Sequence, residues 1–287
     1  MVGGAARRVF SLAAGEMAGL AFGPDERRLD ILFLHANGFN ALTCRSILAP
    51  LGMGMHVLAV DMRGHGLTRL PTETAGHSWR VYRDDLLALL AITGVPRVLA
   101  GHSMGGATAV LASPHLPAAT KLVLFDPVLA PVALYDAAAV HGMGYDMPIA
   151  QGALRRKPNF ESREAAFTAY RGRGAFTTWP DAVLRDYVQD GLRALPEGGF
   201  TLSCAPAWEA ANFAAAGMVN PYMALAETAC RTHVLKADIA PICALTEAQL
   251  DAATRARVRI ETVAGSSHFL PMERPDVVRR ALLNALE

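Results

Sequence analysis

The chain has 287 residues, of which 52% are hydrophobic and 18% charged, so it can bury a large core and is neither disordered nor of low complexity. Its formal net charge of +1 provides no basic excess for nucleic acid or an acidic membrane surface, and we expect neither as a partner. The cysteines are far apart and form no CxxC pair, which favours reduced thiols over disulfides or a zinc site. They are Cys44, Cys204, Cys230 and Cys243.

The first 22 residues combine two arginines with apolar stretches, as a signal peptide would. Gly15 and Glu16 interrupt the apolar run, which favours a two-stranded hairpin instead. No apolar run approaches the length of a membrane span. We therefore expect a soluble cytoplasmic protein.

Short, almost continuously apolar runs then alternate with segments of helical periodicity. Such runs are typical of parallel strands buried on both faces, with helices covering each face of the sheet. The clearest of the helical segments, 79–94, ends at Gly94 before Pro96. The predicted strands of the first half are 30–36, 56–62, 97–103 and 121–127.

This alternation stops between about residues 133 and 230, where we find helix-like pieces broken by glycine and proline and no convincing strand. It resumes with predicted strands 232–238 and 259–265 and a closing helix. The sequence thus predicts an α/β fold with a mostly parallel sheet of about eight strands and flanking helices. Its core domain comprises residues 1–132 and 231–287, and a helical insert spans 133–230.

The sequence GHSMG at 101–105 places Ser103 between a predicted strand and a predicted helix. The G-x-S-x-G pattern in this context is typical of a nucleophile on a strained turn, where flanking residues must lack bulk. Gly101 and Gly105 meet that requirement, while Gly106 allows the helix to approach the sheet. The alternative is a glycine-rich turn with an incidental serine.

A serine nucleophile needs a base, and the base needs a group that orients it. His268 follows the last predicted strand, at the sheet edge where catalytic groups gather. Two carboxylates could orient it: Asp238 after strand 232–238 and Asp126 after strand 121–127. We favour Asp238 because it fits the chain order Ser…Asp…His, and keep Asp126 as the alternative acid. Either aspartate could instead be a capping or turn residue.

An acyl-transfer site also needs backbone N–H groups that stabilise an oxyanion. We expect one from Met104, which follows the serine, and the other from the loop HANGFNA at 35–41. There Gly38 lets the backbone approach a substrate, and the N–H of Phe39, or alternatively of Asn37, turns inward. Asn-Gly is also a common turn dipeptide, and the two interpretations are compatible.

Together the segments FLHANGF, VDMRGHG, GHSMGG and GSSHFLPMERP resemble the α/β-hydrolase superfamily, and the resemblance covers essentially the whole chain. It implies Ser103 as nucleophile, His268 as base, an acid after the penultimate strand, and a cap domain formed by the insert. Serine rather than aspartate at position 103 argues against the haloalkane dehalogenase and epoxide hydrolase branches.

Within this resemblance, we interpret Asp61 and Arg63 as braces for neighbouring loops and His65 as packed or solvated rather than catalytic. Two features depart from the usual pattern. The first motif has H-A-N-G-F in place of H-G, which leaves the donating amide open. The segment KADIAPI, which contains Asp238, lacks the glycine-x-x-aspartate form, which leaves the acid open.

The expected function is a serine esterase or lactonase for a small to medium substrate with an apolar acyl part, without cofactor or metal. Gly38, Phe176 and Trp179 are the predicted substrate-binding residues. The same triad could cleave a carbon–carbon, thioester or amide bond, and a non-catalytic ligand receptor is the alternative of another class. The sequence also leaves open whether the chain forms a homodimer.

Overall fold

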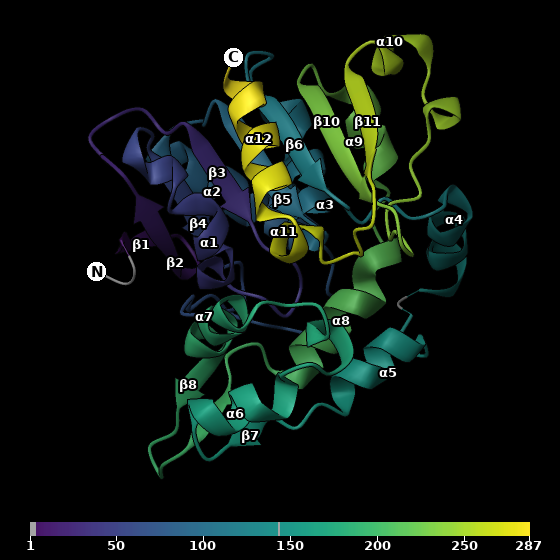
Figure 1. Cartoon of the computed structure of the whole chain (residues 1–287). Helices are drawn as coiled ribbons and strands as arrows, with labels where there is room; N and C mark the ends of the chain where they lie inside the picture. The colour runs from purple at the N-terminus through teal and green to yellow at the C-terminus, as the bar shows by residue number, and fades with distance from the viewer. Residues whose placement is uncertain (1–3, 143) are drawn as a thin grey trace.

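The computed structural model describes residues 4–142 and 144–287; residues 1–3 and 143, within the predicted core and insert, lie outside the described residues (Figure 1). Eight strands form one sheet in the order β1-β2-β4-β3-β5-β6-β10-β11. β1 and β2 form the predicted antiparallel hairpin, β2 pairs antiparallel with β4, and the pairs from β4 to β11 are parallel. The predicted mostly parallel sheet is thereby confirmed. Its strands are β1 (Ala5–Leu12), β2 (Gly15–Phe22), β3 (Ile31–Leu34), β4 (Val57–Val60), β5 (Val98–His102), β6 (Lys121–Phe125), β10 (Arg231–Ala237) and β11 (Val258–Val263).

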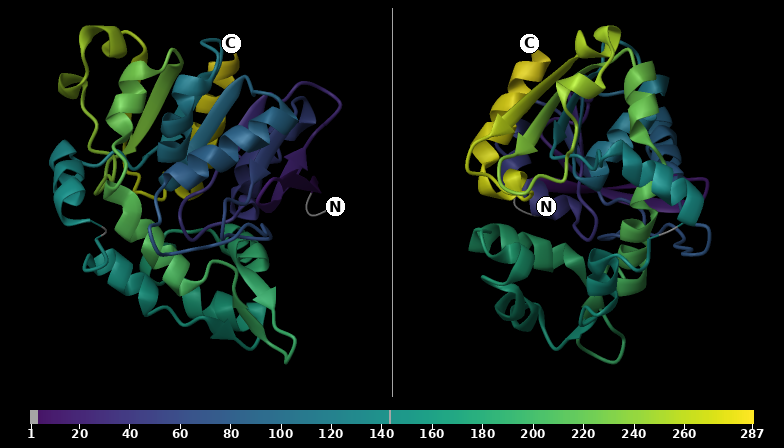
Figure 2. Two further views of the ribbon diagram at one scale, coloured as in Figure 1. Left: turned by 180° about the vertical axis from the view of Figure 1, so that it is seen from behind. Right: turned by 90° about the vertical axis from the view of Figure 1, so that its right-hand side faces the viewer.

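Both faces of the sheet are buried, because successive strand residues point to opposite sides. Ile31 and Phe33 belong to one apolar cluster with residues of α1 and α12, and Leu32 and Leu34 belong to another with residues of α2 and α3. In Figure 1, α12 lies in front of the sheet, and the reverse view in Figure 2 brings α2 and α3 forward. The helices of this part are α1 (Arg45–Leu48), α2 (Arg80–Thr93), α3 (Met104–Ala112), α10 (Ala252–Arg255), α11 (Leu270–Glu273) and α12 (Pro275–Leu286).

In its described residues, the segment between β6 and β10 contains six helices and, contrary to expectation, three short strands that form a separate antiparallel sheet. Strands of two or three residues are too short to produce the alternation that identifies a strand in a sequence. The elements are α4 (Val132–His141), α5 (Pro148–Leu154), β7 (Asn159–Phe160), α6 (Arg163–Tyr170), α7 (Asp181–Gly191), β8 (Leu192–Ala194), β9 (Phe200–Leu202), α8 (Pro206–Ala214) and α9 (Pro221–Glu227).

Short 3-10 turns connect many of these elements. The predicted helical segments near residues 42–52 and 245–256 consist of such turns and one-turn helices rather than of one continuous helix. The turns are η1 (Ala41–Cys44), η2 (Leu51–Met53), η3 (Ser113–His115), η4 (Gly174–Phe176), η5 (Ala215–Gly217) and η6 (Glu247–Gln249).

Most of the segment between β6 and β10 lies beyond one end of the sheet. Helices α5 to α8 group together below the strands in Figure 1, and both views of Figure 2 show the same separation. Helix α9 instead returns to the sheet and packs against α3, with Leu225 buried in the same cluster as Val110. The core and the insert therefore meet at the edge where β5, β6 and β10 end.

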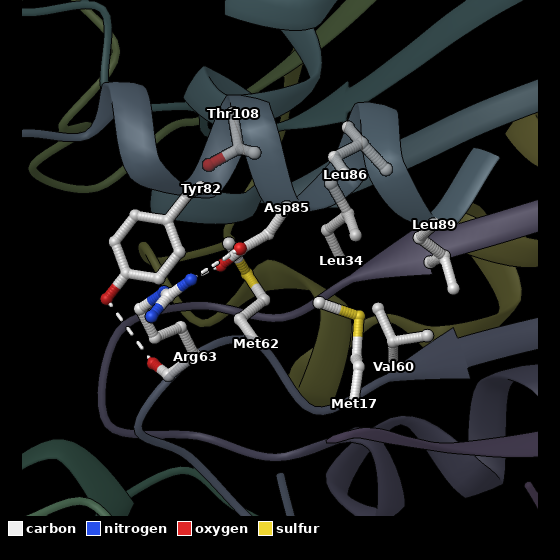
Figure 3. Close-up of a pocket in the computed structure, with 10 residues that line it drawn as sticks. All are labelled: Met17, Leu34, Val60, Met62, Arg63, Tyr82, Asp85, Leu86, Leu89 and Thr108. Carbon is white, nitrogen blue, oxygen red and sulfur yellow. Dashed lines mark hydrogen bonds and ion pairs between the residues drawn. The ribbon is translucent and has the colours of Figure 1, made fainter. Parts of the chain in front are cut away.

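A small cavity between α2 and the sheet is shown in Figure 3, lined by apolar side chains and by the buried pair of Arg63 and Asp85. Its volume of about 10 Å³ is roughly that of one water molecule. The cavity therefore belongs to the packing of the core and is too small for an organic substrate. None of the helices in the described ranges is both long and apolar enough to cross a bilayer.

Candidate active site

Ser103 lies on the sharp turn between β5 and α3, with φ of 55° and ψ of −116°. Residues other than glycine rarely adopt this backbone conformation. The glycines around it are needed for space. A Cβ on Gly101 would lie 2.4 Å from the carbonyl carbon of Gly105, and one on Gly105 would lie 2.4 Å from the Leu34 carbonyl oxygen. A Cβ on Gly106 would lie 2.7 Å from the Cβ of Pro127. These contacts match the predicted strained strand-to-helix turn.

The turn brings the Ser103 hydroxyl to the imidazole of His268. Ser103 Oγ lies 3.0 Å from His268 Nε2, and His268 Nδ1 lies 2.6 Å from Asp126 Oδ2. An ionised carboxylate only accepts hydrogen bonds, so Nδ1 carries the proton and Nε2 is free to accept the hydroxyl proton. This arrangement can pass a proton from the serine to the histidine.

Asp126 is fully buried and sits in the left-handed region, with φ of 37°. Its carboxylate accepts the N–H groups of Ala237 at 3.2 Å, Ile242 at 2.9 Å and Cys243 at 3.4 Å, besides the bond from His268. Burial alone would raise the pKa of Asp126, but these hydrogen bonds outweigh it and hold the pKa below its ordinary value. The carboxylate is therefore ionised at neutral pH.

The favoured acid of the sequence analysis, Asp238, does not meet His268. Asp238 is exposed, and its carboxylate accepts the Gly265 N–H at 3.0 Å, which ties two loops together. The strand β10 ends at Ala237, and the following loop directs a backbone amide, that of Ile242, to the Asp126 carboxylate. The alternative acid, Asp126, occupies the position beside the imidazole.

The expected oxyanion donors differ in the hydrogen bonds that their N–H groups already make. Met104 opens α3, so its N–H is among the amides without a partner inside the helix. The Phe39 N–H already donates to the Ala36 carbonyl at 3.1 Å, and the Gly38 N–H donates to His65 Nε2 at 2.9 Å. Within residues 4–142 and 144–287, no acceptor is found for the Asn37 N–H. The geometry thus favours Asn37, the alternative, over Phe39.

The loop that carries Asn37 is held from both sides. Asn37 Nδ2 donates to the Glu209 carbonyl at 3.0 Å, and Asn37 Oδ1 accepts from Asn212 Nδ2 at 2.9 Å, both residues being on α8. From the core, the carboxylate of Asp61 accepts the Ala41 N–H at 2.7 Å. Helix α8 of the insert and the segment after β4 therefore fix the backbone of this loop.

The residues of the segment after β4 have the structural roles expected from the sequence. Arg63 pairs with the Asp85 carboxylate through two bonds of 2.6 and 2.8 Å. His65 is buried, which lowers its pKa to about 4, so it is neutral and can accept from Gly38. Burial also raises the pKa of Asp61 to about 7. All of these side chains hold neighbouring segments in place. The histidine that contacts Ser103 is His268 and not His65.

Two further residues near the site were missed in the sequence analysis. His102 is buried, and burial lowers its pKa to about 3, so it is neutral and donates through Nε2 to the His268 carbonyl at 2.8 Å. Its position directly before Ser103 in the G-x-S-x-G pattern could have indicated a role near the site. Asn212 accepts from Tyr82 Oη at 2.7 Å and is completely buried. A lone asparagine in an alanine-rich helix gives little indication of that role.

The predicted substrate-binding residues gather at the junction of core and insert. Phe39 lies between the His102 ring, with a centroid distance of 5.8 Å, and the Trp179 ring at 5.1 Å. Phe176 packs edge-on against Trp179 at 5.0 Å. A Cβ on Gly38 would lie 2.7 Å from Glu209 Oε1, so this glycine faces the insert closely. These rings therefore form an aromatic group that packs against His102, the residue before Ser103.

The model of the alpha/beta hydrolase family matches residues 31–281 of the chain. Among curated proteins, 2-(acetamidomethylene)succinate hydrolase of Mesorhizobium japonicum is 32% identical over 95 residues, which cover 33% of this chain and 34% of that protein. An uncharacterized protein of Mycobacterium tuberculosis is 35% identical over 81 residues, 28% of this chain. The match spans only 23% of that protein's length.

Solved structures resemble the chain over nearly its whole length. The crystal structure of E-2-(acetamidomethylene)succinate hydrolase has a TM-score of 0.77 at 20% identity, covering 98% of this chain and 99% of that one. A thioesterase domain from the curacin biosynthetic pathway has a TM-score of 0.74 at 16% identity, covering 97% and 99%. An M. tuberculosis esterase has a TM-score of 0.71 at 19% identity, covering 98% and 92%. Likeness at these identities shows the fold alone.

Proposed function

The chain belongs to the alpha/beta hydrolase family, and from this premise we propose that it is a serine hydrolase that cleaves a small to medium ester or lactone through an acyl-enzyme. The observation that carries the proposal is the continuous hydrogen-bond chain from Ser103 Oγ through His268 to Asp126, with links of 3.0 and 2.6 Å. Hydrogen bonds of this length between hydroxyl, imidazole and carboxylate are those required to activate a serine.

In the first half of the proposed reaction, Ser103 Oγ attacks the carbonyl carbon while His268 Nε2 takes the hydroxyl proton. The imidazolium that forms is stabilised by the ionised Asp126 carboxylate, which also holds the ring in the required tautomer. The tetrahedral intermediate collapses when the bond to the leaving alcohol breaks and His268 returns the proton to that oxygen. Water, deprotonated by the same nitrogen, then hydrolyses the ester on Ser103.

The negative oxygen of the tetrahedral intermediate requires donors that are already in place. We assign this role to the N–H groups of Met104 and Asn37. Support comes from the close packing of the two segments, since a Cβ on Gly105 would touch the loop after β3. Each donor of this kind contributes about a hundredfold to a thousandfold in rate.

The proposed substrate class rests on the aromatic group beside Ser103. Phe39 and Trp179 are buried and Phe176 is half-buried, and these rings pack together next to His102. An apolar acyl part would suit a site next to these side chains. The same triad chemistry applies to thioesters, amides and some carbon–carbon bonds, and only substrates can distinguish these.

The proposal is tested with p-nitrophenyl esters of increasing acyl length, offered to the wild type and to Ser103→Ala. We expect turnover by the wild type with a preferred chain length, and a loss of at least about a thousandfold in kcat/KM in the variant. Ser78→Ala is the matched control and should keep full activity, because the half-buried Ser78 hydroxyl accepts only locally, from the Arg80 N–H at 3.4 Å. If the wild type neither hydrolyses any ester nor reacts with a serine-directed phosphonate, the hydrolase proposal falls and a receptor role gains support.

A further inference from the structure

The carboxylate of Glu273, on α11, links the loop that carries His268 to the insert. Glu273 Oε2 accepts the Ser267 N–H at 2.8 Å, and Oε1 accepts the Ser267 hydroxyl at 2.6 Å. The same Oε1 accepts the Thr178 hydroxyl, also at 2.6 Å. One side chain thus binds the residue immediately before His268 and a residue of the insert 95 positions away in the chain.

Aromatic packing occurs at the neighbouring positions of both segments. Trp179, which follows Thr178, lies edge-on to the Phe269 ring with a centroid distance of 5.9 Å, and Phe269 follows His268. Trp179 is buried although Thr178 is exposed. The hydrogen bond through Glu273 and the contact between the two rings therefore fix the same pair of segments against each other.

Glu273 is suited to hold this connection because it is charged. Burial alone would raise the pKa of Glu273, but the hydrogen bonds from Ser267 and Thr178 outweigh it and hold the pKa below its ordinary value. Hydrogen bonds to an ionised acceptor are shorter and stronger than neutral ones. The loop is also held by the bond from His102 to the His268 carbonyl, by the bond between His268 and Asp126, and by two backbone amides that donate to the Ser266 carbonyl.

We propose that Glu273 is a positioning residue, which holds the His268 loop in place for proton transfer, and that its bond to Thr178 sets the position of the insert over the site. This inference rests on the proposed function for its kinetic part only. Because Glu273 contacts Ser267 rather than the reacting atoms, it acts through the loop and does not take part in bond making. The bonds to Ser267 should affect kcat, and the bond to Thr178 should affect KM.

The kinetic test separates these parts with three variants. Glu273→Ala removes both bonds from Ser267 to Glu273 as well as the bond from Thr178. We expect kcat for a p-nitrophenyl ester to fall about tenfold or more, because a misplaced base slows proton transfer. Thr178→Val removes only the bond to the insert, and we expect KM to rise about threefold with kcat unchanged. Thr177→Val is the matched control, since its hydroxyl donates locally to the Gly174 carbonyl and should leave both constants unchanged.

The pH dependence of kcat/KM distinguishes a role of Glu273 in positioning His268 from a general loss of structure. Glu273→Gln keeps one acceptor oxygen and should retain more of kcat than Glu273→Ala. It also removes a negative charge near the imidazolium, while Asp126 and the neutral His102 remain. Because the imidazolium is then less stable, the acidic limb of the kcat/KM profile should move to lower pH by about half a unit. Wild-type kcat and an unmoved profile in all Glu273 variants would overturn the proposal.

Hydrogen exchange tests the connection without any substrate. In Glu273→Ala we expect exchange of the Ser267 amide to quicken at least about tenfold, because its acceptor is gone. Exchange of the segment around Thr178 should quicken in both Glu273→Ala and Thr178→Val, and not in Thr177→Val. This pattern would support the connection even if the wild type hydrolysed no ester, in which case only the proposed function would fail. Wild-type exchange in both variants would refute the connection.

Discussion

The loops that follow β6 and β10 each begin with an aspartate at the same edge of the sheet, and the two side chains lie in opposite environments. β6 and β10 are neighbours, with Phe125 paired to Leu235. Asp126 is fully buried and binds His268, whereas Asp238 is exposed and accepts the Gly265 N–H. Position after a parallel strand therefore brings a carboxylate to the edge but does not decide whether it faces the site.

The loop after β10 contributes to the site through its backbone. Its amides at Ile242 and Cys243 donate to the Asp126 carboxylate, together with Ala237 at the end of the strand. The loop after β6 therefore supplies the carboxylate, and the loop after β10 supplies N–H groups that help to keep this carboxylate ionised. Like residues in unlike environments should therefore differ in their effects on activity and stability.

The largest difference is expected between the two aspartates themselves. Asp126→Asn should lower kcat/KM for an ester by about ten-thousandfold, because the amide no longer stabilises the imidazolium or selects its tautomer. Asp238→Asn should stay within about threefold of the wild type, since its carboxylate is exposed and accepts from a backbone amide. Steady-state kinetics on both purified variants measures the contrast, and the reverse order would restore Asp238 as the acid.

Two asparagines of the insert, Asn212 and Asn220, should differ in their contribution to stability. Asn212, which is completely buried, accepts from Tyr82 and donates to Asn37. Asn212→Ala should lower the free energy of unfolding by about 2–4 kcal/mol, because it leaves buried partners unsatisfied. Asn220→Ala, which removes only the cap of α9, should cost about 1 kcal/mol. Urea denaturation measures both, and equal losses would argue against Asn212 as an anchor of the insert.

Two glycines with similar backbone angles sharpen the comparison at the site. Gly38 has φ of +76°, and a Cβ added there would lie 2.7 Å from Glu209 Oε1. Gly76 has φ of +66°, and a Cβ added there would meet nothing within 4 Å. Both alanine variants should lose about 1 kcal/mol of stability through strain. Only Gly38→Ala should also lower kcat/KM, by about tenfold to a hundredfold, because it displaces the backbone beside Asn37. Full activity in Gly38→Ala would remove this loop from the proposed site.

The smallest effect is expected from two phenylalanines of the insert. Phe176 lies 5.0 Å from Trp179 in the aromatic group that packs against His102, whereas Phe200 lies in β9 beneath the Arg163 guanidinium at 4.4 Å. Phe176→Ala should raise KM for longer acyl chains about fivefold by removing apolar surface, and Phe200→Ala should leave KM unchanged. Equal KM values in both variants would mean that the acyl chain binds elsewhere.

Local patterns were sufficient to predict the sheet, the hairpin and the turn at Ser103. Each depends on short stretches whose requirements are visible in the sequence, such as apolar runs for strands or glycines beside a tight turn. The choice of acid was not predictable in this way, because Asp126 and Asp238 both follow apolar strands. Only the path of the loop after β10, which places the amide of Ile242 against Asp126, distinguishes them.

The insert was the least predictable part for a related reason. Its strands β7, β8 and β9 are too short to give a pattern, and its contacts with the core connect residues far apart in the chain. Neither the bond from Thr178 to Glu273 nor the one from Asn212 to Asn37 follows from local sequence. Residues that hold the site in place are thus harder to predict than residues with reactive groups.

Labelling with a serine-directed phosphonate, followed by peptide mass spectrometry, tests whether the Ser103 hydroxyl is the nucleophile activated by His268. We expect a single adduct on the peptide containing Ser103, absent in Ser103→Ala and formed at least about a thousandfold more slowly in His268→Ala. An adduct on another residue, or labelling of Ser103→Ala at the wild-type rate, would contradict this assignment.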